Sequence, residues 1–404
     1  MQFDRSLALA CGGLAATAAA LGIGRFVYTP ILPAMLGALG WSKSDAGLVA
    51  SANFLGYFVG ALLAGHPLVA ARPRSWLLAA LAISAASTGG MAALSDIASF
   101  AALRFIGGIA SAFVIVCASA LVLERLALAG RGSLSAVHFA GVGLGIVFSA
   151  VAVSAMLASG AGWRSLWIGS GSIALLAAIM AAWLIPAAGT ITAPSGLQAR
   201  RSAEPSRLGA MVMAYGLFGF GYVITATFLV TMVRVSDEVR VLEPWVWVLF
   251  GLAAIPSVAF WTRLGERIGI INAYALACII EAIGVAASVE WVTISGVCFS
   301  ALLLGGTFMG ITALGFMAVQ MLSTENPHQA FGRMTASFGI GQMVGPTLAG
   351  FLSEQSGSFR AASLIAAAAL IAAAALAIRT SWIAAASAGK SRPVRGIAKI
   401  QPTR

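Results

Sequence analysis

Long apolar stretches separated by short polar segments run through the whole chain of 404 residues. Each is about as long as the roughly 20 residues that an α-helix needs to cross the hydrocarbon core of a bilayer. Charged residues, proline and glycine mark their boundaries. We expect twelve membrane-spanning helices, at residues 7–36, 45–65, 75–94, 97–123, 133–158, 163–185, 208–232, 244–262, 270–289, 291–322, 331–352 and 360–383. The pattern predicts an all-α polytopic membrane protein.

The composition agrees with this pattern and argues against a soluble enzyme. Hydrophobic residues make up 60% of the chain and charged residues only 9%, with a mean hydropathy of +0.96. Ordinary soluble domains are about 45–50% apolar and about 25% charged. The four cysteines lie in apolar stretches without a Cys-x-x-Cys spacing, so we expect neither a disulfide framework nor a metal site. No motif indicates a cofactor.

The net charge of +11 is better explained by orientation in a membrane than by binding to nucleic acid. No basic run is interleaved with stacking aromatic residues, which argues against a nucleic-acid partner. If the loops alternate between two sides, 17 of the 24 Lys and Arg residues lie on the side with both termini, 5 lie on the other, and Arg25 and Arg104 lie within spans. The positive-inside rule then places both termini in the cytoplasm.

A polar segment divides the spans into six and six. Its composition predicts a cytoplasmic linker over residues 187–206, between an N-terminal six-helix bundle over 1–186 and a C-terminal bundle over 207–385, followed by a basic cytoplasmic tail over 386–404. Landmarks recur between the halves. Gly-Trp-Arg at 162–164 opens the sixth span, and Ser-Phe-Arg at 358–360 opens the twelfth, 196 residues later. This predicts two parallel copies of a six-helix unit.

The sequence resembles the major facilitator superfamily of transporters over nearly its whole length. Residues 262–269 (TRLGERIG) resemble the cytoplasmic loop signature G-x-L-a-D-R-x-G, with Glu266 in place of Asp. Residues 104–108 (RFIGG) resemble the signature R-x-x-x-G, and residues 341–346 (GQMVGP) resemble G-x-x-x-G-P. Residues 22–30 (GIGRFVYTP) and 51–57 (SANFLGY) resemble the bacterial YbfB/YjiJ-like branch. The resemblance implies two six-helix bundles around a central cavity, lined by the first, fourth, seventh and tenth spans.

Two arginines inside spans are the first candidates for a functional site, because charges within a membrane are costly and mark function by default. Arg25 is followed by Pro30 and Pro33, which should bend or break its helix. It either faces the cavity and binds an anionic group or reaches the outer headgroups from the end of the span. For Arg104 the family resemblance implies a cavity-facing arginine tied to proton or substrate coupling. The alternative is a structural charge that caps neighbouring carbonyl groups.

Polar side chains in the spans are further candidates, either for the cavity or for hydrogen bonds between helices. The set for the substrate or coupling site comprises Arg25, Tyr28, Asn53, Tyr57, Arg104, Tyr215, Tyr222 and Gln342. The pairs Gly56/Gly60 and Gly341/Gly345 predict close helix packing.

Three other positions carry weaker expectations. Glu281 is an acid deep inside a span and could carry a proton, although a place between packed helices or at the lipid face is the stronger expectation for this span. His138 could titrate near neutral pH, with a hydrogen-bonded packing role as the favoured alternative. The resemblance implies that Glu266 and Arg267 lie in a loop that locks one conformation. The first-half loop has Val69 where the signature has Asp, so no such lock is expected there.

These features favour a secondary transporter that works by alternating access and moves a small solute. The family resemblance alone suggests proton coupling. No P-loop or catalytic motif indicates an enzyme. A sensor or an intramembrane enzyme is the alternative class. The two uncompensated arginines favour an anionic solute, with a neutral metabolite as the rival. We expect the protein to act as a monomer.

Overall fold

The computed structural model describes residues 5–186, 205–323 and 327–390. The part of the chain that it describes is all-helical. The first half contains α1 (Arg5–Thr17), a π-helix (Ala18–Ile23), α2 (Tyr28–Leu39), α3 (Lys43–Ala64), α4 (Pro67–Ala71), α5 (Pro73–Gly90), a 3-10 turn (Met91–Ala93), α6 (Ile97–Leu128), a 3-10 turn (Gly132–Leu134), α7 (Ser135–Ala158) and α8 (Trp163–Leu184). The second half contains α9 (Pro205–Arg234), a 3-10 turn (Arg240–Leu242), α10 (Glu243–Ile268), α11 (Ile270–Glu290), α12 (Ile294–Leu322), α13 (Pro327–Ser356) and α14 (Arg360–Lys390).

The long helices match the predicted spans one for one. In the described residues, 11 helices are long and apolar enough to cross a membrane. The twelfth predicted span corresponds to α13, which is rich in glycine and polar residues and packs lengthwise against α3 and α9. The short α4 was not predicted. It begins at Pro67, which is well placed at the first turn of a helix because its missing N–H is not needed there.

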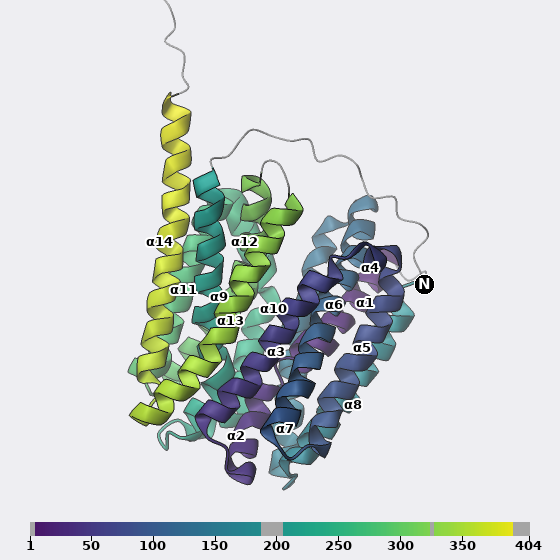
Figure 1. Ribbon diagram of the computed structural model, residues 1–404, viewed down its shortest axis with the longest axis vertical. Helices are drawn as coiled ribbons and strands as arrows, with labels where there is room; N and C mark the ends of the chain where they lie inside the picture. Colours follow the sequence, from purple (N-terminus) through teal and green to yellow (C-terminus); the bar gives the residue numbers. More distant parts are fainter. Residues whose placement is uncertain (1–4, 187–204, 324–326, 391–404) are drawn as a thin grey trace, which may run out of the picture.

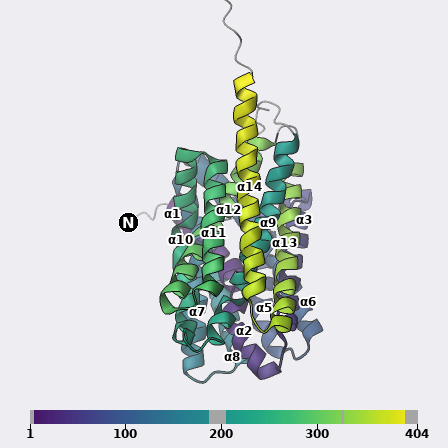
Figure 2. The ribbon, with the colours of Figure 1, turned by 90° about the vertical axis from the view of Figure 1, so that its left-hand side faces the viewer.

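Large apolar side chains cover the outer surface of the bundle. Those on α8, α11 and α14 include Leu176, Ile283 and Ile371, each of which is 47% exposed or more. A soluble protein of this size would not expose such a belt, whereas lipid tails solvate it. Figure 2 shows α11 and α14 on this outer face of the second half. The exposure pattern therefore supports the membrane assignment.

The two halves repeat the same packing. In the first half α3 packs on α6, α5 on α8, and α1 on α7; in the second half α10 packs on α12, α11 on α14, and α9 on α13. Figure 1 shows the first half on the right and the second on the left, with long helices running in the same general direction. These equivalences agree with the internal repeat that the sequence predicts.

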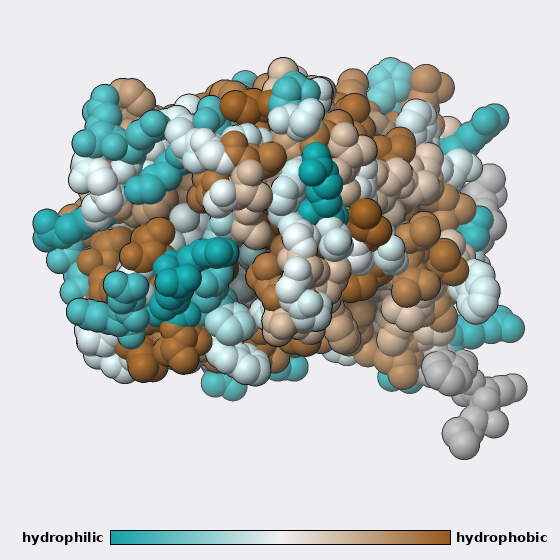
Figure 3. Space-filling model, turned by 90° about the horizontal axis from the view of Figure 1, so that it is seen from below, coloured by the Kyte–Doolittle hydropathy of each residue, from teal (hydrophilic) through white to brown (hydrophobic). Residues whose placement is uncertain are grey.

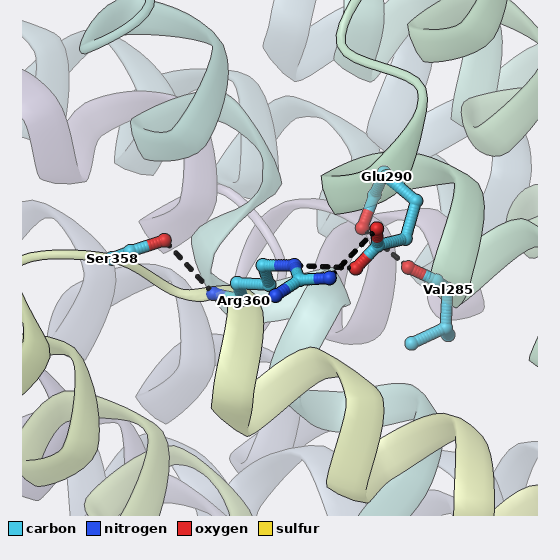
Figure 4. Close-up of polar contacts among 5 residues, drawn as sticks. Val285, Glu290, Ser358 and Arg360 are labelled. Atoms are coloured by element: carbon cyan, nitrogen blue, oxygen red, sulfur yellow. Dashed lines mark hydrogen bonds and ion pairs between the residues drawn. The ribbon is translucent and has the colours of Figure 1, made fainter.

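The two arginines of the repeated landmark have equivalent roles. Arg164 opens α8 and donates from Nε to the carbonyl of Ala92, just beyond α5, at 3.0 Å. Arg360 opens α14 and binds Glu290 at the end of α11, with Nε to Oε1 at 2.6 Å and a second bond to Oε2 at 3.1 Å (Figure 4). Each arginine thus joins the start of the last helix of its half to the end of the third.

The halves meet along two seams, where α3 lies against α13 and α7 lies against α10. Glycines allow the approach. A Cβ atom at Gly47 would overlap the carbonyl of Pro346, and one at Gly143 would lie 2.7 Å from the carbonyl oxygen of Gly251. About one helical turn along α3 from Gly47, Ser51 Oγ and Thr347 Oγ1 are 2.8 Å apart. These contacts hold the functional site between the halves.

Candidate functional site: a buried arginine between the two halves

The first span is broken at residues 24–27, as its prolines predict. Pro30 has no N–H to donate to the preceding turn. Upstream, the hydrogen bond from the Phe26 N–H reaches back to Leu21 as in a π-helix, and the Thr29 N–H bonds to Phe26 rather than to Arg25. No backbone N–H of the described residues donates to the carbonyls of Gly24 and Arg25. The break therefore leaves two carbonyl oxygens that need other donors.

Arg104 of α6 supplies both donors. Its two terminal nitrogens donate to the carbonyls of Gly24 and Arg25, each at 3.0 Å. The guanidinium also lies 5.0 Å from the centre of the Tyr28 ring, and its side chain is only 5% exposed. Asn53 Nδ2 in turn donates to the Arg104 carbonyl at 2.7 Å. In this conformation Arg104 caps neighbouring carbonyls, which agrees with the structural alternative, and it also lines the small cavity that adjoins the helix break.

Arg25 occupies the centre of the interface between the halves. Its side chain is 5% exposed, so it does not reach the headgroups. One terminal nitrogen donates to Gln342 Oε1 of α13 at 2.9 Å. The guanidinium lies over the rings of Tyr57 and Phe54 of α3, at 4.2 and 4.6 Å from their centres. Its Nε has no hydrogen-bond partner. The arginine is thus held by one amide oxygen and two aromatic faces.

The second half forms an aromatic wall beside Arg25. Gln342 Nε2 donates to the Tyr222 hydroxyl of α9. The Tyr222 ring stacks on Phe308 of α12 and Phe338 of α13, at 5.9 and 6.1 Å between ring centres. Tyr215, seven residues before Tyr222 on α9, also stacks on Phe338, at 4.7 Å between ring centres. Hydrogen bonds therefore link Arg25 to the Gln342 amide and the amide to the Tyr222 hydroxyl. The Tyr222 ring is part of the aromatic wall.

The structure brings the predicted set into one neighbourhood. Arg25 contacts Tyr57 and Gln342, and Gln342 contacts Tyr222. Arg104 caps the helix break that carries Arg25. Tyr28 lies against the Arg104 guanidinium, and Asn53 donates to the Arg104 backbone carbonyl. Tyr215 belongs to the wall. The site also contains residues that sequence reasoning did not select: Thr29, Phe54, Phe308 and Phe338. Of these, Thr29 donates to the Ala226 carbonyl of α9 at 2.8 Å and is a contact between the halves that only the fold reveals.

Two cavities of the described part of the chain bear on the choice of site. A small one adjoins the helix break, lined by Arg25, Phe26, Tyr28, Thr29, Ala50, Phe54, Arg104, Ala226 and Thr227. A larger one of about 220 Å³ lies where α9 and α11 end and α14 begins, with Lys43 at its edge. The larger cavity contains none of the predicted site residues. The chemistry favours the small one, because both buried arginines line it.

No carboxylate of the described residues is paired with Arg25 or Arg104. The described ion pairs join Arg234 to Glu243 and Arg360 to Glu290, at helix ends. An unpaired guanidinium in a low-dielectric interior is costly, and partners that hydrogen-bond it recover only part of that cost. The site is therefore short of negative charge. In the described residues, no group of His, Cys, Asp and Glu could hold a metal ion that would alter this balance.

Glu266 and Arg267 lie outside this neighbourhood. The expected loop is instead the last turn of α10, which ends where Gly269 adopts a φ of +93°. Both side chains are exposed, and no ion pair of either is present in the part of the chain described. The lock implied by the family resemblance is not formed in this conformation.

His138 and Glu281 are both fully buried, in different places. Ser119 Oγ lies 3.1 Å from His138 Nε2, and the ring packs so tightly on α1 that a Cβ at Gly13 would overlap it. This agrees with a hydrogen-bonded packing role for His138. Glu281 is 0% exposed in α11 and has no hydrogen-bond partner for either oxygen. Of the two places expected for Glu281, the structure agrees with the one between packed helices, because α9, α10, α12 and α14 all pack against its helix.

Replacement of Arg104 by methionine should lower the stability of the protein by about 2 kcal/mol, because two buried charge-assisted hydrogen bonds are lost and two carbonyls are left unpaired. We expect a lower unfolding temperature in detergent. Arg74→Met is the matched control, since Arg74 also donates to two carbonyls, those of Ala182 and Ile185, but in a half-buried position. An unfolding temperature unchanged by Arg104→Met would contradict the capping role, and equal shifts for the two variants would show that burial does not strengthen it.

Long apolar helices that surround a buried polar site between two repeated halves define a membrane transporter. The chain belongs to the family described as uncharacterised MFS-type transporter YbfB, which it matches over residues 17–378. It is therefore a transporter of the major facilitator superfamily that moves a small solute by secondary transport, and not an enzyme. The superfamily and branch resemblance of the sequence is confirmed.

Solved structures agree on the fold. An aspartate-to-alanine mutant of the nucleoside transporter NupG is 16% identical, with a TM-score of 0.70, covering 93% of this chain and 99% of that one. The structure of NupG itself is 14% identical, with a TM-score of 0.67, covering 94% and 99%. At these identities the likeness concerns the fold alone. No curated protein has a sequence that matches this chain.

Proposed function

We propose that the protein moves a small organic anion across the bacterial inner membrane by alternating access, with Arg25 as the residue that binds the anionic group. The observation that carries this proposal is the state of Arg25. It is a buried cation between the two halves, and an amide oxygen stands where a carboxylate would be a stronger partner. A bound anion would supply the missing charge and displace Gln342 Oε1.

The surroundings of Arg25 favour an anion with an apolar or aromatic body. Phe54 and Tyr57 lie against the guanidinium, and Tyr222, Phe308 and Phe338 form a stacked wall close by. A planar carboxylate could pair with Arg25 while its ring contacts these rings. Benzoate is a simple probe of this chemistry. The likeness in fold to a nucleoside transporter favours a neutral solute with a planar ring as the second candidate.

The orientation proposed for the chain follows from charge. With 17 of the 24 Lys and Arg residues on the side of the termini, the N-terminus, the linker and the tail would face the cytoplasm. The proposed division places one bundle at 1–186 and the other at 207–385, while most of the linker at 187–206 and the end of the tail lie outside the described residues. A monomer suffices for this scheme, because the site lies between the halves of one chain. No nucleic-acid partner is proposed.

In this orientation the end of the α3–α13 seam where α3 begins and α13 ends would face the outside. Lys43 Nζ donates to the Ser353 carbonyl there at 3.4 Å, and Ser44 hydrogen-bonds Glu354. Figure 3 looks onto this end of the molecule and shows hydrophilic and apolar side chains mixed across it. Alternating access requires these contacts to separate in each transport cycle.

A disulfide across the seam should therefore stop transport. The variant Ser51→Cys with Thr347→Cys places two thiols where oxygen atoms are now 2.8 Å apart, which is close enough for oxidation to join α3 to α13. We expect oxidation to abolish exchange of labelled benzoate across proteoliposomes and reduction to restore it. Each single-cysteine variant, oxidised in the same way, is the control. Full exchange by the cross-linked protein would contradict a seam that opens during transport.

A further inference from the structure

A cavity of about 220 Å³, which the anion site does not use, lies where α9 and α11 end and α14 begins. The most deeply buried side chains in its lining are apolar. Leu229 and Val233 of α9 and Val297 of α12 are each 2% exposed or less. The lining therefore includes side chains from the packed core of the second half as well as from its surface.

Lys43 of α3 is the charged residue among the described side chains that line this cavity. Its Nζ lies 5.1 Å from the centre of the Phe359 ring and donates to the Ser353 carbonyl at 3.4 Å, which is long for a hydrogen bond. None of the described ion pairs includes Lys43. An ammonium group has three donors, so the carbonyl leaves others for an anion at the edge of the cavity.

The acidic residues around this end of the molecule do not compete for Lys43. Asp45 caps its own helix through Ser42, and Glu354 hydrogen-bonds Ser44. Asp237 and Glu238, in the turn after α9, are exposed and do not line the cavity. The cavity therefore combines one available cation with an apolar interior.

Size and charge together identify the kind of molecule that fits. A volume of 220 Å³ holds about seven groups of the size of a water molecule, each of which occupies roughly 30 Å³. A phospholipid with two long acyl chains is far too large, whereas the chain of a medium-length carboxylate fits. Its carboxylate would bind the Lys43 ammonium, and its chain would remove the apolar side chains of Leu229, Val233 and Val297 from water. Octanoate is a probe of this chemistry.

The cavity spans the two halves of the protein. Lys43 belongs to the first half, and the other lining residues belong to the second. The backbone of Lys43 is also part of the α3–α13 seam, because a Cβ atom at Gly350 of α13 would overlap the Lys43 carbonyl oxygen. A carboxylate on Lys43 with its chain in the second half would join the halves where α3 begins. A ligand that binds one conformation better shifts the protein toward it, so occupancy favours the conformation in which this end is closed.

We propose that this cavity is a second, regulatory site, which binds a carboxylate with a medium-length apolar chain and slows transport by holding the two halves together. The site is distinct from the one at Arg25, which lines the other cavity. The effect on transport rests on the proposed function, whereas binding to the cavity does not.

Binding of labelled octanoate to the protein in nanodiscs of neutral lipid tests the site, with uptake by protein-free nanodiscs subtracted. We expect saturable binding that Lys43→Gln weakens about tenfold, because a charge-assisted hydrogen bond is lost. Val289→Phe, which fills the cavity from α11, should weaken it as much. The matched controls are Arg164→Gln, at the start of α8, and Val241→Phe, an exposed valine outside the lining, and both should bind as the wild-type protein does.

Chain length gives a second measure of the same site. Affinity should rise about fourfold for each CH₂ group added between butanoate and octanoate, as burial of the chain requires. Dodecanoate should gain nothing further, because its chain exceeds the cavity. Octanoate binding of wild-type strength in either cavity variant would overturn the proposal, and so would binding that Arg25→Gln abolishes and Lys43→Gln leaves intact.

Benzoate exchange in proteoliposomes, without any gradient, tests the regulation. Saturating octanoate should slow exchange by the wild-type protein at least about fivefold, and should have little effect on Lys43→Gln or Val289→Phe. Exchange that octanoate leaves unchanged, or that excess benzoate restores, would overturn the regulatory role, since restoration would place octanoate at the benzoate site. If wild-type protein exchanges no benzoate, the proposed function fails, and octanoate binding still decides whether the cavity is a site.

Discussion

Arg25→Gln should weaken benzoate binding and transport by roughly 30-fold or more, which corresponds to about 2 kcal/mol for removing one partner of a buried charge pair. Glutamine keeps hydrogen-bonding capacity but removes the charge that the anion needs. The measurement is the dependence of benzoate exchange in proteoliposomes on benzoate concentration. Because Arg25 is buried without a carboxylate, its removal should not lower the unfolding temperature.

Two further variants, Arg25→Lys and Arg164→Gln, serve as comparisons for Arg25→Gln. Arg25→Lys keeps the charge but loses the planar fork that faces Gln342 and the aromatic rings, so we expect an intermediate affinity. Arg164→Gln removes an arginine that binds a carbonyl outside the site, and it should bind benzoate as the wild-type protein does. Wild-type affinity in Arg25→Gln would show that the anion does not bind at this residue.

Gly56→Ala should destabilise the protein by about 3 kcal/mol, at the upper end of the usual cost of overpacking. A Cβ at this position would overlap the carbonyl oxygen of Phe105, where α3 crosses α6, and a backbone atom cannot move aside as a flexible side chain can. The expected result is a large loss of folded protein in detergent and a lower unfolding temperature.

Gly306→Ala is the matched control for this change. Gly306 also lies inside a membrane helix, α12, but a Cβ there would meet no atom within 4 Å. We expect it to leave the unfolding temperature unchanged or slightly raised, because alanine favours helix more than glycine does. Equal losses for the two alanine variants would mean that close packing of α3 on α6 does not determine stability.

The spans, the break in the first helix and the close packing of the glycine pairs could be predicted from local patterns. Each depends on residues near one another in the chain: apolar length, Pro30 and Pro33, and glycines four apart. Gly341 and Gly345 do meet α9 closely, as Gly56 and Gly60 meet α6. The superfamily motifs pointed to the same fold.

The partner of Arg25 could not be predicted in this way. Gln342 is 317 residues away, and nothing in the sequence indicates that the two side chains meet. Phe308 and Phe338 were missed for a similar reason, because aromatic residues in apolar spans resemble ordinary packing until the fold stacks them on Tyr222.

Arg104 shows a different limit of sequence reasoning. Its signature indicated a functional arginine, but the unpaired carbonyls that it caps exist only because the first helix breaks opposite it. The same break carries Arg25, so the structural role of one arginine positions the other. A pattern within one helix does not contain that relation.

A cationic site between the halves should select an anion. Exchange of benzoate, benzamide and benzamidine by wild-type protein in proteoliposomes tests it most directly, because the three probes have nearly the same shape and differ in charge. We expect benzoate to be exchanged fastest, benzamide slowly, and benzamidine not at all, since its amidinium would meet Arg25. Exchange of benzamide or benzamidine as fast as benzoate would contradict this expectation.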